Sequence, residues 1–397
     1  MQSVMSGLDV LAAENFQRLR GLRVGLVAHP ASGDSRLRHA ADLLAATPGV
    51  KLEAVFGPEH GWLGQAQDLE AVAGAVPATP RGPRVVSLYG DTVASLRPTA
   101  EQLAGLDVLV IDLQDIGARY YTFQATMLYC LEAAQALGLR VLVLDRPNPL
   151  GGLAVEGPAL RPGFESFVGP HDLATRHGMT LGELAQFYQA ERKLDQAALE
   201  IIRCEGWRRE MFFEETGLPW VLPSPNMPTV DTAVVYPGQC LLEGTHLSEG
   251  RGTTRPFELC GGPELPAGAL ATRLNGERLA GVTFRPACFQ PTFQKHAGKT
   301  CGGVQLHVTD RAAFQPVRTG LAVLAVLREF SGGHFRWRTE TYEFVSNPMA
   351  IDLLFGSDRE RLALEAGQSW RDLAAAWTVE EKEFRERREP FLLYPVS

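Results

Sequence analysis

The chain has 397 residues, of which 45% are hydrophobic, and it carries a formal net charge of -8. This length suits a folded protein with a large core and two or three domain-sized units. An acidic chain with a pI near 5.7 lacks the clustered Lys and Arg on which nucleic-acid binding depends, which argues against a polyanion as the principal partner. No stretch approaches the roughly 20 apolar residues of a membrane-spanning helix.

Two features bear on the compartment of the protein. Met1–Asp9 contains neither the basic nor the apolar segment of a secretory signal. From the sequence as written we expect a cytoplasmic protein, or an exported one from which a leader has been removed. The six cysteines lie far apart and form no CxxC pair, so we expect mostly free structural thiols, typical of a reducing compartment.

Apolar runs alternate with helical patterns in the first part of the chain. Helices are expected at 36–46 and 123–137, and strands at 23–28, 52–56, 108–113 and 140–145. Continuous apolar runs of this kind are typical of buried parallel strands. The order predicts an α/β fold with a Rossmann-like, doubly wound domain over residues 1–160, or to about 230 at the furthest.

The amino-acid composition changes after about residue 151, where Gly and Pro become frequent. A helix is predicted over 179–192, capped by Thr180 with Glu183 three residues on. A long Pro- and Gly-rich stretch at 219–263 is followed by further predicted elements: strands at 282–289 and 303–308, and helices at 317–330 and within 358–388. These elements predict a second, smaller α/β or α+β domain over residues 161–397.

Polar residues follow four of the predicted strands, and doubly wound sheets bind ligands beyond the carboxyl ends of their strands. A surface loop can be polar without any function, so each residue alone has a structural explanation. Four converging strand ends nevertheless predict a site. The residues concerned are His29, Glu59, His60, Gln114, Asp115, Arg119, Arg146 and Asn148.

Several familiar motifs are absent from the sequence. The turn after 23–28 is not GxGxxG, and there is no GxxxxGK[ST] loop, so we expect no nucleotide cofactor. The sequence contains no HExxH motif, so we expect no zinc site of that kind. It contains no GxSxG motif either, so we expect no catalytic serine of the α/β-hydrolase type. A metal site assembled from His60, Asp115 and His177 stays open as the less favoured alternative.

The segment Phe56–Trp62 places an acid at a strand-to-loop turn beside an aromatic ring. In the functional interpretation, Glu59 faces a sugar ring on which Trp62 stacks, and a partly desolvated carboxyl acts as a general acid. In the structural interpretation, Glu59 caps a helix and Trp62 fills the core.

Three other segments carry candidate groups. Arg119 follows a buried strand and can pair with a ligand carboxylate, or with Asp115. Glycoside hydrolysis commonly needs two acids, and Glu243 and Glu249 are the candidates for the second. Asn226, in the rigid turn 223–228, can bind an acetamido or hydroxyl group, or form an Asx-turn.

Taken together, these segments resemble the exo-β-N-acetylmuramidases, a bacterial glycoside hydrolase family of cell-wall recycling. The resemblance spans most of the chain and rests on 56–61, 112–122, 144–149, 155–158, 177–180, 223–226, 236–238, 243–253 and 256–258. It implies a Rossmann-like N-terminal domain, a smaller C-terminal domain and an active site in the cleft between them, with no cofactor.

The resemblance also implies roles for residues of this chain. Glu59 matches the catalytic acid, with Tyr121, Glu243 and Glu249 as further catalytic candidates. The implied substrate is a small muropeptide or disaccharide, whose terminal N-acetylmuramic acid carries a lactyl carboxylate that Arg119, Arg146 or Arg251 can pair with. The substrate-binding candidates are His60, Gln114, Asp115, Arg119, Tyr120, Arg146, Asn148, His177, Asn226, Arg251 and Thr253.

Two alternatives of another class remain. A non-catalytic amino-sugar-binding protein would bind the sugar tightly without hydrolysing it. A metal-dependent hydrolase would lose its activity in a chelator.

Overall fold

A six-stranded parallel sheet dominates the N-terminal half of the computed structural model, which describes residues 3–74, 82–194 and 198–396. Its order, β3-β2-β1-β4-β5-β6, is that of a Rossmann sheet and confirms the predicted α/β class. The last strand follows residue 160, so the sheet is not complete at the earlier expected boundary. The strands are β1 (Arg23–Ala28), β2 (Lys51–Gly57), β3 (Arg84–Ser87), β4 (Val108–Asp112), β5 (Arg140–Leu144) and β6 (Leu199–Ile202).

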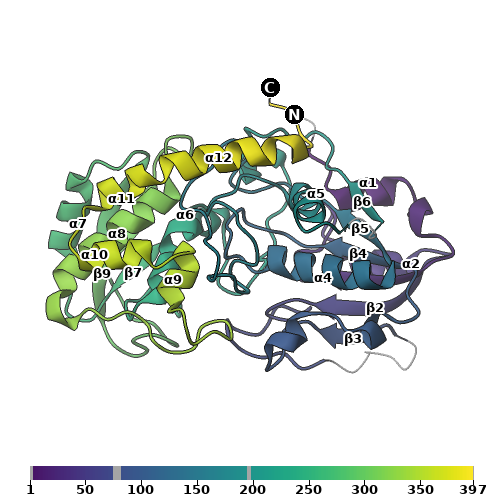
Figure 1. Ribbon diagram of the computed structural model, residues 1–397, viewed down its shortest axis with the longest axis horizontal. Helices are drawn as coiled ribbons and strands as arrows, with labels where there is room; N and C mark the ends of the chain where they lie inside the picture. Colours follow the sequence, from purple (N-terminus) through teal and green to yellow (C-terminus); the bar gives the residue numbers. More distant parts are fainter. Residues whose placement is uncertain (1–2, 75–81, 195–197, 397) are drawn as a thin grey trace.

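Both faces of this sheet are covered by helices (Figure 1). In β4, Val108 and Val110 pack in the same hydrophobic cluster as α1 and α2, whereas Leu109 and Ile111 belong to the cluster of α4 and α5. A strand buried on both faces needs apolar side chains throughout, which explains its continuous apolar run. The helices of this half are α1 (Gly7–Ala13), α2 (Ala40–Ala46), α3 (Ala100–Leu103), α4 (Phe123–Leu137) and α5 (Leu181–Glu191).

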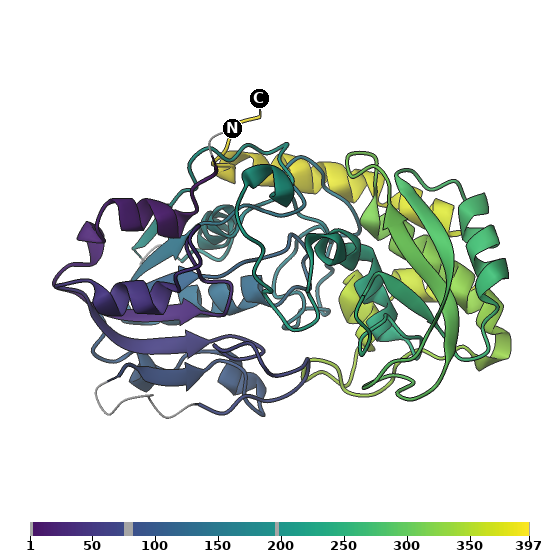
Figure 2. The ribbon, with the colours of Figure 1, turned by 180° about the vertical axis from the view of Figure 1, so that it is seen from behind.

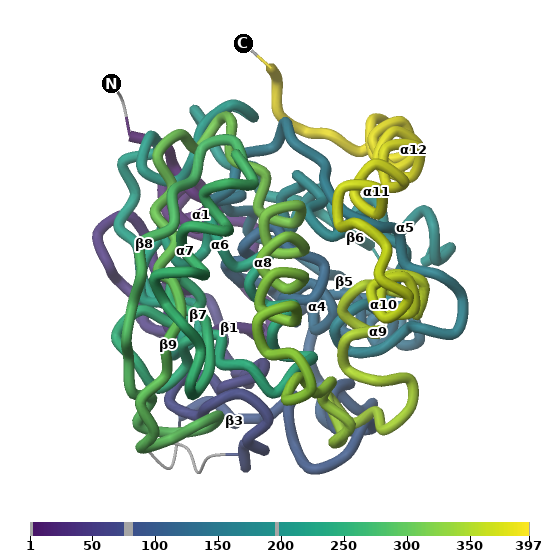
Figure 3. The backbone as a smooth tube through the Cα atoms, turned by 90° about the vertical axis from the view of Figure 1, so that its left-hand side faces the viewer, coloured from purple at the N-terminus to yellow at the C-terminus, as the bar shows by residue number. Residues whose placement is uncertain are grey.

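The C-terminal half contains an antiparallel sheet of order β7-β9-β8. Figure 2 shows this sheet on the far side of the molecule from the parallel one, and Figure 3 shows α8 between it and the last helices. The strands are β7 (Leu259–Gly262), β8 (Val282–Phe289) and β9 (Cys301–Val308). The helices are α6 (Val230–Gln239), α7 (Ala267–Gly276), α8 (Pro316–Ser331), α9 (Ala350–Phe355), α10 (Arg359–Glu365), α11 (Trp370–Ala376) and α12 (Thr378–Arg388).

Helices α6 and α8 cross at two glycines. A Cβ built on Gly320 would lie 2.2 Å from the carbonyl oxygen of Gly238, and a Cβ on Gly238 would lie 1.9 Å from that of Pro316. Only residues without a side chain permit this approach of the two backbones. The pair fixes α6, whose C-terminal end leads into the segment that carries Glu243.

The C-terminal tail returns to the parallel sheet. Helix α12 spans both halves along one edge of the molecule (Figure 1), and the tail that follows it packs Tyr394 against Val4, Cys204 and Trp207. The Tyr394 hydroxyl donates a hydrogen bond of 2.5 Å to Asp145 at the end of β5. The two ends of the described chain therefore lie together.

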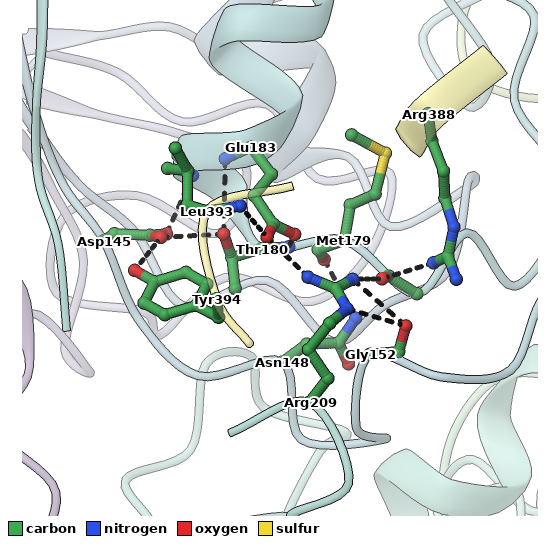
Figure 4. Close-up of polar contacts among 12 residues, drawn as sticks. Asp145, Asn148, Gly152, Met179, Thr180, Glu183, Arg209, Arg388, Leu393 and Tyr394 are labelled. Atoms are coloured by element: carbon green, nitrogen blue, oxygen red, sulfur yellow. Dashed lines mark hydrogen bonds and ion pairs between the residues drawn. The ribbon is translucent and has the colours of Figure 1, made fainter. Parts of the chain in front are cut away.

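Figure 4 shows the buried polar network around this tail. Asp145 also accepts hydrogen bonds from the Thr180 hydroxyl at 2.7 Å and the Gly182 amide at 2.8 Å. Glu183 pairs with Arg209 at 2.5 Å and accepts the Leu393 amide at 2.8 Å. Burial raises the pKa of Asp145 to about 6, against the opposing effect of its hydrogen bonds.

Two further observations concern the sequence expectations. All six cysteines are free, and only Cys288 is exposed. Within the described residues, no helix is both long and apolar enough to cross a bilayer. Met1 and Gln2, the start of the segment inspected for a leader, lie outside the described residues.

Candidate active site

One pocket gathers polar side chains from both halves of the molecule. The parallel sheet contributes the residues after β2 and β4, and the C-terminal half contributes residues after α6, before β7 and before α9. The pocket is lined by Glu59, His60, Asp68, Tyr120, Tyr121, Thr122, Phe123, Val168, Ser224, Asn226, Met227, Tyr236, Glu243, Arg251, Phe257, Tyr342 and Glu343.

A tight turn at the end of β2 carries Glu59 into this pocket. The Gly61 amide donates to the Pro58 carbonyl at 2.9 Å, and Gly61 has a φ of 78°, which favours glycine. Glu59 is 5% exposed, and its Oε2 accepts a hydrogen bond of 2.6 Å from the Thr122 hydroxyl. Because Thr122 immediately precedes α4, the Glu59 carboxyl lies at the positive end of that helix dipole.

Arg251 is the centre of an ionic cluster on the opposite wall. Its guanidinium lies 2.7 Å from Glu243, 3.2 Å from Asp68 and 3.5 Å from Glu249. Burial would lower the pKa of Arg251, but these carboxylates hold it well above its usual value. Glu243 also accepts a hydrogen bond of 2.7 Å from the Tyr342 hydroxyl, so its charge is compensated twice.

Glu343 stands at the tip of a turn in the segment before α9. Tyr342 and Val345 exchange two backbone hydrogen bonds of 2.9 Å, with Glu343 and Phe344 between them at φ values of 44° and 69°. The Oε2 atom of Glu343 accepts a hydrogen bond of 3.0 Å from the Tyr89 hydroxyl. Burial, together with the carboxylates of Glu59, Glu243 and Asp68, raises the pKa of Glu343 well above its usual range.

Aromatic rings complete the lining. Tyr236 contacts Tyr120, Tyr121 and Phe257 edge to face, with ring centroids 4.8 to 5.8 Å apart. The Tyr120 hydroxyl donates to the Pro237 carbonyl, and burial raises the pKa of Tyr121. Trp62, by contrast, packs against His39 and the core outside the pocket, which fits the structural interpretation of this ring.

The pocket brings together seven of the residues that the sequence singled out. The Asn226 amide donates to Gln67 at 2.7 Å, and His60 is oriented by the Ala66 carbonyl at 2.9 Å. These seven residues are Glu59, His60, Tyr120, Tyr121, Asn226, Glu243 and Arg251.

Arg119 does not line the pocket. Its side chain is fully enclosed and donates to the carbonyl oxygens of Pro158 and Leu173 at 2.8 and 2.7 Å, and to that of Leu354 at 2.8 Å. It ties two loops to helix α9, so its guanidinium is not placed to bind a substrate carboxylate, contrary to the expectation from the sequence. The Asp115–Arg119 pair is not formed either, since Asp115 accepts the Gly117 amide at 2.6 Å.

Four other expected residues, three of them at strand ends, hold loops together instead of lining the pocket. Arg146 forms a buried salt bridge with Asp112 at 2.5 Å, in which each charge compensates the other. Asn148 donates to the Met179 carbonyl at 2.9 Å, and Gln114 to the Pro147 carbonyl at 3.1 Å. His177 is buried 3.5 Å from Asp115.

Glu249 and Thr253 lie beside the pocket but not in its lining. Lys295 lies 2.8 Å from Glu249 and neutralises it, and the Thr253 hydroxyl donates to the Gly250 carbonyl at 2.6 Å. Of the two acids expected as the second catalytic group, Glu243 alone faces the pocket. Among the described residues, no three His, Cys, Asp or Glu side chains are grouped in a way that could hold a metal ion.

Sequence reasoning missed Asp68, Thr122 and Glu343 as site residues. Glu343 lies between two aromatic residues, in a segment for which neither a helix nor a strand was predicted. An acid flanked by Tyr342 and Phe344 was the available signal.

A second, wider cavity adjoins the first, and Asp68 lines both. The inner pocket has a volume of about 30 Å³ and the outer cavity one of about 420 Å³. The outer cavity is rich in cationic and imidazole groups and is lined by Asp68, Leu69, Thr245, His246, Gln294, Lys295, His296, Arg338 and Glu340.

Comparison with known proteins gives consistent matches over nearly the whole chain. Residues 24–231 match the family model described as exo-beta-N-acetylmuramidase NamZ, N-terminal, and residues 234–394 match its C-terminal counterpart. A curated relative, peptidoglycan beta-N-acetylmuramidase NamZ of Bacillus subtilis (strain 168), is 44% identical over 98% of this chain and 91% of its own length.

Two solved structures share the fold, both crystal structures of DUF1343 family proteins from Bacteroides fragilis NCTC 9343. One has a TM-score of 0.88 and 33% identity, covering 99% of each chain. The other has a TM-score of 0.78 and 26% identity over the full length of both. The chain therefore belongs to the exo-β-N-acetylmuramidase family of glycoside hydrolases.

Proposed function

We propose that this protein releases N-acetylmuramic acid from the non-reducing ends of β-1,4-linked peptidoglycan fragments. One observation carries the proposal: Glu59, buried at the end of a parallel strand, shares a pocket with carboxyls and aromatic rings from the other half. Glycoside hydrolysis commonly uses two such carboxyls at the scissile bond. The name of the Bacillus subtilis relative supports the substrate class.

The two adjoining cavities support action at a chain end. The terminal sugar would be cleaved at the inner pocket, and the remaining chain would extend past Asp68 into the outer cavity. Muramic residues carry lactyl carboxylates, and the guanidinium of Arg338 lines the outer cavity, where it could pair with one. Of the arginines expected to bind such a carboxylate, Arg251 is the one that lines the inner pocket.

The test is hydrolysis of a 4-nitrophenyl β-N-acetylmuramide by the wild type and by Glu59→Gln, with and without EDTA. We expect Glu59→Gln to lower kcat by about 10²- to 10⁴-fold, the usual contribution of a positioned acid or base. EDTA should leave the rate unchanged.

The matched control is Glu53→Gln, the same substitution at an exposed position of the same strand, and it should keep wild-type activity. Equal rates for Glu59→Gln and the wild type would remove Glu59 from the mechanism. Faster hydrolysis of the corresponding N-acetylglucosaminide would overturn the substrate assignment.

A further inference from the structure

Four carboxyl groups line the inner pocket, but they are not compensated equally. Arg251 pairs with Glu243 and Asp68, and Tyr342 adds a hydrogen bond to Glu243. Burying a carboxylate without a cation is costly, and closely spaced carboxyls cannot all ionise. The distribution of partners therefore decides which carboxyl keeps a proton.

Glu59 has the surroundings of an ionised group. It accepts the Thr122 hydroxyl at 2.6 Å and lies at the N-terminal end of the 15-residue helix α4. A helix N-terminus stabilises negative charge, and more so when the site is partly buried.

Glu343 lacks any such compensation. Among the described residues, its carboxyl accepts a hydrogen bond only from the neutral Tyr89 hydroxyl, and no cation pairs with it. The titratable and charged groups that act on it from neighbouring elements are Glu59, Tyr89, Glu243 and Asp68, and burial together with these carboxylates raises its pKa. The surroundings of Glu343 therefore favour its protonated, neutral form.

The backbone that carries Glu343 is unusual for its sequence. A two-residue turn with positive φ at both central positions favours Asn and Gly, yet Glu343 and Phe344 occupy them. Positive φ is unfavourable for a residue with a side chain, and such residues cluster at functional sites. Phe344 anchors the turn against Tyr89, with ring centroids 5.6 Å apart.

We propose that Glu343 is the proton donor of this site and that Glu59 is its ionised partner. This rests on the proposed glycosidase function, and it replaces the expectation that Glu59 itself is the acid. As the bond from the sugar C1 to the glycosidic oxygen breaks, Glu343 gives its proton to the departing oxygen. The Glu59 carboxylate stabilises the positive charge that develops at C1. Water supplies the oxygen of the new C1 hydroxyl and the proton that restores the pair.

The experiment compares two leaving groups in the wild type and in Glu343→Gln. A sugar leaving group needs protonation, whereas 2,4-dinitrophenolate leaves without it. With the disaccharide N-acetylmuramyl-β-1,4-N-acetylglucosamine we expect a kcat loss of about 10²- to 10⁴-fold. With 2,4-dinitrophenyl β-N-acetylmuramide the loss should stay within about tenfold. Glu59→Gln should be impaired on both substrates.

Two further variants keep the test decisive. Glu329→Gln, exposed at the end of α8, should match the wild type on both substrates. Tyr89→Phe removes the hydrogen bond that lowers the pKa of Glu343, so the basic limb of kcat/KM against pH should move to higher pH. This shift is measurable even if Glu343→Gln does not fold.

The outcomes for the inference and for the proposed function differ. Equal losses on both substrates in folded Glu343→Gln, or an unmoved basic limb in Tyr89→Phe, would overturn the role of Glu343 alone. A wild type that hydrolyses neither muramide would overturn the proposed function instead.

Discussion

The hydroxyl of Thr122 makes the one hydrogen bond that the structure assigns to the Glu59 carboxyl, at 2.6 Å. Hydrogen bonds to charged groups contribute about 1.5–3 kcal/mol, and 1.36 kcal/mol corresponds to a factor of ten in rate. We therefore expect Thr122→Val to lower kcat at least about tenfold at constant stability, measured on the chromogenic muramide.

A control for this substitution lies one turn further along α4. Thr126 is fully buried and its hydroxyl has no hydrogen-bond partner. Thr126→Val removes the same atom from the same helix and should keep wild-type kcat. A similar loss in both variants would mean that the helix, not the bond to Glu59, is responsible.

The candidate site could be predicted in part at the level of residues. Glu59 and Glu243 stand in dense polar motifs, and the pocket contains both. Arg119 and Arg146 stand at strand ends in the same manner, but their guanidinium groups bind carbonyls and Asp112. The sequence shows that a residue follows a strand, but it does not show in which direction the loop carries the side chain of that residue. Glu343 was missed because Glu and Phe do not predict a turn with positive φ, which left its aromatic neighbours as the one available signal.

Among the elements, the crossing of α6 and α8 is tightly constrained. A Cβ on Gly320 would lie 2.2 Å from a backbone oxygen, and backbone cannot yield as a flexible side chain can. We expect Gly320→Ala to lower the free energy of unfolding by at least about 1–3 kcal/mol, the usual cost of overpacking. Denaturant unfolding would measure it.

Gly268 in α7 provides the opposite case. A Cβ there meets nothing within 4 Å, so Gly268→Ala should be neutral or stabilise the protein by up to about 1 kcal/mol through helix propensity. If both alanine variants were equally stable, close packing of α6 on α8 would not be a constraint.

The same elements show what sequence patterns reveal about the fold. Helix α4 and strand β1 have the predicted bounds, and α5 begins after the predicted cap Thr180, because periodicity and capping are local signals. Helix α6 was missed within the Pro- and Gly-rich stretch 219–263, since Pro237 lies inside it and Gly238 packs against α8. Strand β6 was missed because it is short and only partly buried.

At the scale of the whole molecule, Asp145 makes the free energy of unfolding dependent on pH, because burial raises its pKa. Its pKa is about 6 in the folded protein and 3.8 as a reference for the unfolded chain. Its contribution to stability is therefore complete below about pH 4 and is lost as the pH rises through 6. The difference of 2.2 pKa units corresponds to about 3 kcal/mol.

The measurement compares the wild type with Asp145→Asn, which does not titrate. The stability of the wild type relative to the variant should fall by about 3 kcal/mol between about pH 3 and about pH 8 in denaturant unfolding. A difference that does not change with pH would show that Asp145 has an ordinary pKa.

The returning tail also limits how the two halves can move. The chain joins them twice, through the segment between β6 and α6 and through α12 with Tyr394. An inner pocket of about 30 Å³ holds little more than water, whereas pockets for small ligands reach several hundred Å³, roughly 300 or more. Two fixed joins oppose a sliding apart of the halves and leave a hinge rotation about the line between them. If the halves rotate to admit a sugar, residues that never touch the sugar would set the axis of that rotation.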